Sequence, residues 1–235
     1  MAVLAFLFAG CGGAPKHTAR VAPPPDVPPP AATRTRPVPV PASEPDTVVP
    51  SKGKALYTEI GRASWYGPGF QHRHAANGEV FDMNRMSAAH LTIPLNSIVR
   101  VTNLKTGESV VLPITDRGPF VSDRIIDLSK AAAEKVGVYG HGGAMVKIEV
   151  LESPAPIRTG GKWCVQIGAF SKNQDATALK AHLVRRYPTS RVLQFGAPDG
   201  GEWLRIRVPD DDKHRAEEVI KEITTMVGVF LVRLD

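Results

Sequence analysis

Proline is distributed unevenly along this chain of 235 residues, and its distribution limits how the first part of the chain can fold. Most of the 21 prolines lie between Pro15 and Pro50, in runs such as Ala22-Pro23-Pro24-Pro25. Proline fixes φ and has no amide hydrogen to donate, so a segment this rich in proline forms neither helix nor sheet. We therefore expect residues 11–56 to form a disordered, extended tether that holds the N-terminal residues at a distance from the rest of the chain.

A short apolar stub, residues 1–10, precedes the tether. A membrane-spanning helix needs roughly 20 apolar residues, so the stub indicates the end of a secretory leader. Ala9-Gly10-Cys11 resembles the processing site of bacterial lipoproteins, which predicts that Cys11 is acylated and anchors the chain to a membrane. A buried thiol is the alternative, but a proline tract leaves nothing to bury it. Phe8 replaces the usual Leu or Val, and no basic residue precedes the stub, which indicates a leader that is truncated or marginal.

The net charge of +6 suits several kinds of anionic partner. Basic residues are scattered and form no Lys/Arg block, which disfavours nucleic acid and leaves anionic polymers and membrane surfaces. The second cysteine, Cys164, has no disulfide partner within the chain if Cys11 is acylated. No histidine motif accompanies Cys164, so we expect a strand residue and not a nucleophile.

Short alternating segments dominate the region from residue 57 to 152. Asn103 to Gly107 separates two of them, which is typical of a hairpin. Many short strands with a single small helix indicate a compact barrel. The predicted elements are strands at residues 98–102, 109–114, 125–128 and 144–151, and a helix that Ser129 caps and Gly137 ends.

A second unit is predicted at residues 162–235, after a linker at residues 153–161 that contains proline and glycine. Its elements have the order β-α-β-β-α-β, which is typical of a ferredoxin-like sandwich. The predicted strands are residues 163–170, 191–195, 203–208 and 229–234, and the predicted helices are residues 174–187 and 213–226.

Two carboxylates in the first unit, Glu79 and Asp116, lie in glycine-rich turns near aromatic residues. Acids that move protons and flat rings that hold sugars are what a glycan-cleaving site needs. The motifs are Ser64-Trp65-Tyr66-Gly67, Ala76-Asn77-Gly78-Glu79 and Asp116-Arg117-Gly118-Pro119. In order and spacing they resemble the rare lipoprotein A family, bacterial lytic transglycosylases that act on peptidoglycan. The resemblance implies that residues 57–152 form a six-stranded double-psi β-barrel.

The same resemblance implies three catalytic residues. Asp116, at a strand end, is the expected acid and base, although a turn aspartate bonded to local backbone is the alternative. Glu79 is expected to stabilise positive charge or to keep Asp116 protonated, unless it is a solvated loop residue. His90 is expected to bond a carboxylate or a sugar hydroxyl, with a purely structural histidine as the alternative. The further carboxylates Asp123 and Asp127 are expected to be structural.

Four residues around these three are expected to hold substrate: Trp65, Tyr66, Asn77 and Arg117. One of the two rings would stack on a sugar while the other packs inside. The family commonly has lysine and threonine before its Ala-Asn-Gly-Glu motif, where this chain has His74 and Ala75. His72 and His74 raise a zinc alternative, but no further His, Asp or Glu pattern accompanies them, so we expect no metal and no cofactor.

The opening strand of the second unit resembles that of the SPOR domain, which binds peptidoglycan strands stripped of peptides at division sites. If Leu204 and Ile206 face the helices, a sugar-binding face would carry Gln166, Trp203, Arg205 and Arg207. A plain half-exposed sheet is the alternative. The family's Gly-Pro-Phe after the third strand is absent here, and so is the aromatic signature of an RNA-recognition sandwich.

Together the two resemblances imply an endolytic lytic transglycosylase of the bacterial cell envelope, which yields anhydro-muramic acid ends. We expect it to be lipid-anchored, to face the periplasm and to be enriched at the septum on peptide-free glycan. Partners in the division machinery are not identified by any motif. A non-catalytic, expansin-like wall-binding protein is the alternative.

Overall fold

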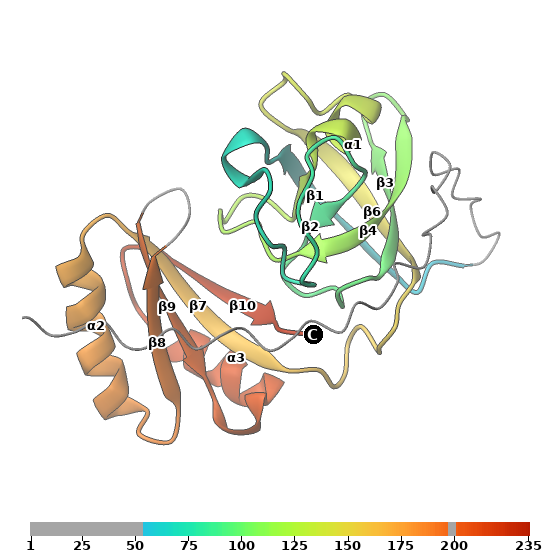
Figure 1. The fold of residues 1–235 in the computed structure, drawn as a ribbon. Helices are drawn as coiled ribbons and strands as arrows, with labels where there is room; N and C mark the ends of the chain where they lie inside the picture. The colour runs from blue at the N-terminus through green and yellow to red at the C-terminus, as the bar shows by residue number, and fades with distance from the viewer. Residues whose placement is uncertain (1–53, 197–200) are drawn as a thin grey trace, which may run out of the picture. The chain divides into compact units, whose positions relative to one another are not determined.

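A computed structural model describes residues 54–196 and 201–235 of the chain (Figure 1). The predicted leader, Cys11 and nearly all of the predicted tether lie outside the described residues. Within the described ranges no helix is both long and apolar enough to cross a membrane. The fold consists of a closed barrel and, later in the chain, a four-stranded sheet with helices.

Six strands close the barrel in the order β1-β5-β2-β4-β3-β6, which confirms the predicted six-stranded barrel. The pairs β1–β5 and β2–β4 are parallel, and the other four pairs are antiparallel. Parallel neighbours need crossover connections, so the barrel is not a simple meander. The strands are β1 (Tyr57–Trp65), β2 (Ala88–Ala89), β3 (Ile98–Asn103), β4 (Ser109–Asp116), β5 (Ile126–Leu128) and β6 (Ala144–Glu152).

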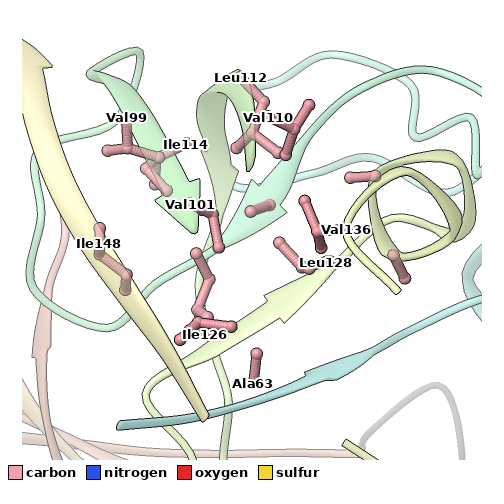
Figure 2. Packing of buried hydrophobic residues seen from close by; sticks show 14 of the residues in the cluster. Ala63, Val99, Val101, Val110, Leu112, Ile114, Ile126, Leu128, Val136 and Ile148 are labelled. Atoms are coloured by element: carbon pink, nitrogen blue, oxygen red, sulfur yellow. The ribbon is translucent and has the colours of Figure 1, made fainter. Parts of the chain in front are cut away.

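The barrel core comes from alternate residues of these strands (Figure 2). Along β3, Val99 and Val101 are fully buried while the residues between them are not, and β6 repeats this pattern. Successive side chains of a strand point to opposite faces, so alternation of this kind fills the inside of the barrel with branched apolar side chains. Other core members are Ala63, Ile93, Leu112, Ile114, Ile126, Leu128, Val146, Ile148 and Val150.

Local signals in the sequence explain the turn and the single helix of the barrel. In the β3–β4 hairpin, Asn103 Oδ1 accepts a bond from the Lys105 amide at 2.9 Å, and Gly107 adopts φ +78°. Ser129 caps helix α1 (Lys130–Lys135) by accepting a bond from the Ala132 amide at 3.2 Å. The predicted hairpin and helix cap are therefore confirmed.

The C-terminal sheet has the order β10-β7-β9-β8, with helices α2 and α3 packed on one face, which confirms the ferredoxin-like prediction. Helix α3 ends at Glu222, four residues earlier than predicted, because Ile223 adopts an extended conformation ahead of Thr224 and Thr225. Such β-branched residues favour extended backbone. The elements are β7 (Trp163–Phe170), α2 (Asn173–Arg186), β8 (Arg191–Gly196), β9 (Glu202–Arg207), α3 (Lys213–Glu222) and β10 (Gly228–Arg233).

Candidate active site

Asp116 is the last residue of β4, and a bulge directs its side chain. Along β2 the neighbours Ala88 and Ala89 pair with Ile114 and Asp116, so that Thr115 is an extra residue in β4. Without the extra residue, Asp116 would point to the same side as Ile114, which lies in the barrel core. The bulge instead gives Asp116 the outward direction of Ala89. The acid is thereby placed on the rim of the barrel.

The carboxyl group of Asp116 is held through one of its oxygens. Oδ1 accepts backbone hydrogen bonds from Ala76 at 3.0 Å and from Arg117 at 2.8 Å. Burial raises the pKa of Asp116 above its ordinary value, although these two bonds and the charge of Arg117 oppose the rise. Because both bonds go to Oδ1, Oδ2 remains for proton transfer. An acid with a raised pKa is suited to protonating a leaving group.

The loop that carries Glu79 is fastened to the end of β4. The Asn77 amide donates to the Thr115 carbonyl at 3.0 Å, next to the bond between Ala76 and Asp116. Asn77 then turns the chain: its Oδ1 accepts from the Glu79 amide at 3.0 Å, and Gly78 adopts φ +91°. This arrangement brings the Glu79 turn and Asp116 together. The Glu79 side chain is exposed.

His90 contacts a carboxylate that sequence reasoning did not select. Its Nε2 lies 3.3 Å from Oε2 of Glu59 on β1, and Tyr57 donates its hydroxyl to the same oxygen at 3.0 Å. Its Nδ1 accepts from the amides of Thr92 and Ile93 at 3.1 and 3.0 Å. This network assigns the proton to Nε2. Because both ring nitrogens are hydrogen-bonded, the buried imidazole holds the rim loop in place.

A signal for Glu59 does exist in the sequence. It occupies an inward-facing position of β1, between Tyr57 and Ala63, which both contact the core. A charged residue at such a position requires a buried partner. Sequence analysis missed Glu59 because its partner is 31 residues away.

Arg117 reinforces the same loop as His90. Its Nη1 donates to the carbonyl oxygens of His90 at 2.9 Å and Ile93 at 2.7 Å. Substrate binding was expected of Arg117, and the structure places this guanidinium nitrogen on the backbone of the barrel rim.

The two adjacent aromatic residues pack against other rings. The Tyr66 ring stacks on Phe81 with a centroid distance of 4.4 Å, and Phe70 meets its edge at 5.8 Å. Trp65 contacts Tyr139 at 4.8 Å and packs against the barrel core. Both rings are half-buried. Tyr66 thereby packs beside the Glu79 loop through Phe81, while Trp65 lies against Tyr139.

Asp127 lies on the other side of Ala89 from Asp116, on β5. Its Oδ1 is 3.2 Å from Nη1 of Arg124, and Asp123 forms a looser ion pair with Arg62 at 3.7 Å. Burial raises the pKa of Asp127 to about 6 in spite of the Arg124 charge. Both aspartates thus have basic partners, and a structural role for them stays a prediction.

The residues predicted for the sugar-binding face of the C-terminal sheet contact neighbours within their own domain. Leu204 and Ile206 are fully buried beneath the helices, so the alternation prediction for β9 is correct. Trp203 and Gln166 lie on the other face, and Gln166 is paired with Arg205 across the sheet. The Trp203 ring covers Gly168, where a Cβ would lie 2.6 Å from the ring.

The two arginines of this face are also engaged. Arg205 donates to Gln166 Oε1 at 2.8 Å and lies over the Phe195 ring. Arg207 forms a two-fold ion pair with Asp211 and keeps a partly exposed side chain.

Within the ranges that the structure describes, no group of three or more His, Cys, Asp or Glu side chains is arranged to hold a metal. His72 and His74 are exposed, and His74 Nδ1 lies 3.2 Å from the Gly78 carbonyl oxygen. Cys164 is fully buried on β7, and burial raises the pKa of its thiol to about 11, which makes it a poor nucleophile at neutral pH.

The Glu59–His90 contact predicts a pH-dependent contribution to stability. The His90 hydrogen bond lowers the pKa of Glu59 below its ordinary value of 4.5. The stabilisation is therefore complete above about pH 4.5 and is lost as the pH falls through the lower, folded-state pKa. We expect Glu59→Gln to reduce the free energy of unfolding at pH 7 by about 1 kcal/mol, and the difference from the unsubstituted protein to shrink near pH 3.

Thermal or denaturant unfolding followed by circular dichroism at both pH values measures this effect. Glu152→Gln, at an exposed glutamate that ends β6, serves as the control and should change little. Equal destabilisation by Glu59→Gln at both pH values would contradict the assignment.

Comparison with known proteins agrees with the two parts of the fold. The family pattern described as "Lytic transglycolase" matches residues 58–148, and the SPOR domain pattern matches residues 159–233. Among solved structures, a Clavibacter michiganensis expansin is 15% identical over 75% of this chain and 86% of its own, with a TM-score of 0.35. A similarity this weak says nothing about the function of this chain.

Curated relatives share far more of the sequence. The endolytic peptidoglycan transglycosylase RlpA of Neisseria meningitidis serogroup B is 39% identical over 73% of this chain and 67% of its own length. The protein of the same name from Pseudomonas aeruginosa strain UCBPP-PA14 is 46% identical over 78% of this chain and 54% of its own. The chain thus spans between about half and two thirds of these relatives. Both domain patterns match this chain, the transglycosylase pattern first and the SPOR pattern after it. Together with the similarity to these relatives, this shows that the chain belongs to the RlpA family of lytic transglycosylases with a C-terminal SPOR domain.

Proposed function

We propose that this protein is an endolytic peptidoglycan lytic transglycosylase that cleaves between N-acetylmuramic acid and N-acetylglucosamine. The observation that carries the proposal is the environment of Asp116. A bulge directs this acid to the barrel rim, and burial raises its pKa. The names of the relatives support the same reaction.

Asp116 serves as both acid and base in the proposed reaction. Its protonated carboxyl gives a proton to the glycosidic oxygen as the C1–O bond breaks, and positive charge develops on the muramic acid ring. The carbon-six hydroxyl of that sugar then attacks C1 and returns a proton to Asp116. The products are a 1,6-anhydro-muramic acid end and a free N-acetylglucosamine hydroxyl, and the acid is regenerated.

The remaining candidate residues support this step. Glu79 stabilises the positive charge in this proposal, which its exposed position in a turn tied to β4 supports. Asn77 fixes that turn through its own side chain. His90 and Arg117 act as positioning residues because their bonds hold the rim backbone beside Asp116. Trp65 and Tyr66, which are both only half-buried, would meet the sugar with the part of each side chain that stays exposed.

Asp116→Asn should abolish the release of anhydro products while folding and glycan binding stay near those of the unsubstituted protein. A general acid typically contributes 10²-fold or more to the rate. Glu79→Gln should be severely impaired, and His90→Ala less so. The measurement is mass spectrometry of sacculi incubated with residues 54–235. Activity of Asp116→Asn within about tenfold of the unsubstituted protein would remove it from the acid role.

The same spectra distinguish this function from its rivals. Anhydro ends identify a transglycosylase, reducing ends identify a hydrolase, and intact sacculi identify a non-catalytic, expansin-like binder.

The C-terminal domain has a separate task in this proposal. It has its own core, built from both helices and all four strands, which supports independent folding. Arg205 and Arg207 lie on the face away from the helices, where the exposed Arg191 pairs with Arg207 across the sheet. We propose that this face binds peptide-free glycan and enriches the enzyme at the septum.

A fluorescent fusion of residues 162–235 should collect at division sites, and more strongly when amidases have exposed peptide-free glycan. Arg205→Ala with Arg207→Ala should disperse the fusion, since both charges would be lost. Lys180→Ala with Lys221→Ala, on the helices, is the matched control and should leave it at the septum. Uniform envelope fluorescence of the unsubstituted domain would contradict the targeting role.

Membrane attachment is proposed from the sequence alone, through a lipid on Cys11. Cys11→Ser should convert the protein from a membrane-bound to a soluble periplasmic form, because the acyl chains that partition into the bilayer would be lost. Metabolic labelling with an alkyne fatty acid, in cells that express the gene from its verified start codon, measures the modification. No label on the unsubstituted protein would rule out the anchor.

A further inference from the structure

An exposed apolar patch lies on the outer wall of the barrel, where β1, β6 and the end of β3 run side by side. Ile60 on β1 is 58% exposed, Met145 on β6 is 51% exposed, and Leu104, directly after β3, is 48% exposed. Clustered apolar side chains with a polar surround mark a binding surface, whereas single ones need no explanation. None of the steps described above uses this patch.

The strand pairing makes the three side chains neighbours. Ile60 pairs with Lys147, and Arg62 pairs with Met145. Ile60 and Met145 are therefore diagonal neighbours on the outer face of two paired strands, within reach of each other. The Leu104 amide donates to the Met145 carbonyl oxygen at 3.0 Å, which places Leu104 beside Met145. The three residues thus form one patch.

The charged side chains around the patch have an excess of positive charge. Five cations lie on this wall or at its edges: Lys54, Arg62, Arg100, Lys105 and Lys147. Three acids accompany them: Glu108, Asp123 and Glu149. Glu149 is shared, because Lys147 lies 3.3 Å and Arg100 lies 3.8 Å from the same carboxylate oxygen. Asp123 lies 3.7 Å from Arg62. The wall as a whole is therefore basic.

This combination of side chains suits the surface of an anionic lipid bilayer. Aliphatic side chains enter the boundary of the acyl region, while ammonium and guanidinium groups meet the lipid phosphates. The long stems of lysine and arginine cover the transition between the two regions. Sugars, in contrast, stack on aromatic rings, and the patch consists of an isoleucine, a leucine and a methionine. Its chemistry therefore favours lipid over glycan.

The place of the patch in the closed barrel agrees with such a partner. Going round the barrel, β1, β6 and β3 make up one half, and β5, β2 and β4 make up the other. Asp116 ends β4 and pairs with Ala89 of β2, which is three strands away from β6 in either direction. A barrel that rests on β6 therefore leaves the β2 side, with the candidate acid, free for substrate.

We propose that the wall formed by β1, β6 and the end of β3 binds an anionic membrane surface. Ile60, Met145 and Leu104 enter the lipid boundary, and Arg62 and Lys147 lie at the phosphates. The contact needs neither an acyl chain on the protein nor the cleavage of glycan, so it goes beyond the proposed function. It orients the barrel on the membrane with its site facing away.

Vesicle co-sedimentation of residues 54–235 tests this contact without any lipid on the protein, because Cys11 is missing. These residues contain the whole barrel core and the whole core of the C-terminal domain. The fragment should bind vesicles of phosphatidylethanolamine and phosphatidylglycerol, and should bind neutral phosphatidylcholine vesicles far more weakly. A basic residue near an anionic surface contributes about fivefold to binding, so Lys105→Gln should weaken it by about that factor.

The apolar part of the contact is tested by Ile60→Ser with Met145→Ser. Both side chains are more than half exposed, so their replacement leaves the barrel core intact. The double variant should bind anionic vesicles roughly tenfold more weakly, because two apolar side chains no longer leave water. Val184→Ser with Met226→Ser, at an exposed valine and methionine of the C-terminal domain, is the matched control and should bind normally. Circular dichroism and thermal unfolding establish that the variants fold.

Several results would overturn the proposal. They are the absence of binding to anionic vesicles, equal binding to neutral vesicles, and an equal loss of binding in the patch variant and its control. Analytical ultracentrifugation tests for a second copy of the chain as the occupant. A dimer that Ile60→Ser with Met145→Ser dissociates would assign the patch to self-association in place of lipid.

Discussion

The pairing of β2 with β4 is the constraint on which the candidate site depends. One extra residue, Thr115, makes Asp116 and not Thr115 the partner of Ala89. Strand alternation would otherwise place a carboxylate on the core side, beside Ile114, where nothing could pair with it. The same bulge frees the Thr115 carbonyl to accept the Asn77 amide, so one irregularity both directs the acid and attaches the Glu79 loop.

Opposing effects then set the proton affinity of Asp116. Two backbone amides and the Arg117 charge favour the carboxylate, and burial favours the neutral acid. Burial is the larger effect, so the pKa is raised. The amides suit the proposed reaction nevertheless, because both bind Oδ1 and leave Oδ2 to exchange the proton. A group that first gives and later recovers a proton needs a fixed oxygen of this kind.

Sequence reasoning succeeded where the relevant contacts are local. Three features depend on residues only a few positions apart: the alternating valines in β3 and β6, the Ser129 cap and the Asn103–Gly107 turn. It could not detect the bulge, because a one-residue offset arises only from the pairing of two strands. The end of α3 was missed for a different reason: apolar spacing continues past Glu222, while the backbone preference of Ile223 ends the helix.

Asp116, Glu79 and His90 show how much of the candidate site the family resemblance could predict. Their order along the chain indicated a shared task. In the structure the turns of Asp116 and Glu79 meet at one edge of the barrel, while the His90 ring bonds to Glu59 and to its own loop. That loop also receives Arg117, the residue directly after the acid. A histidine held by both nitrogens cannot exchange protons with a substrate unless it breaks these bonds. The contact of His90 with the candidate acid runs through the backbone, because the His90 amide donates a hydrogen bond to the Asp116 carbonyl oxygen at 3.1 Å.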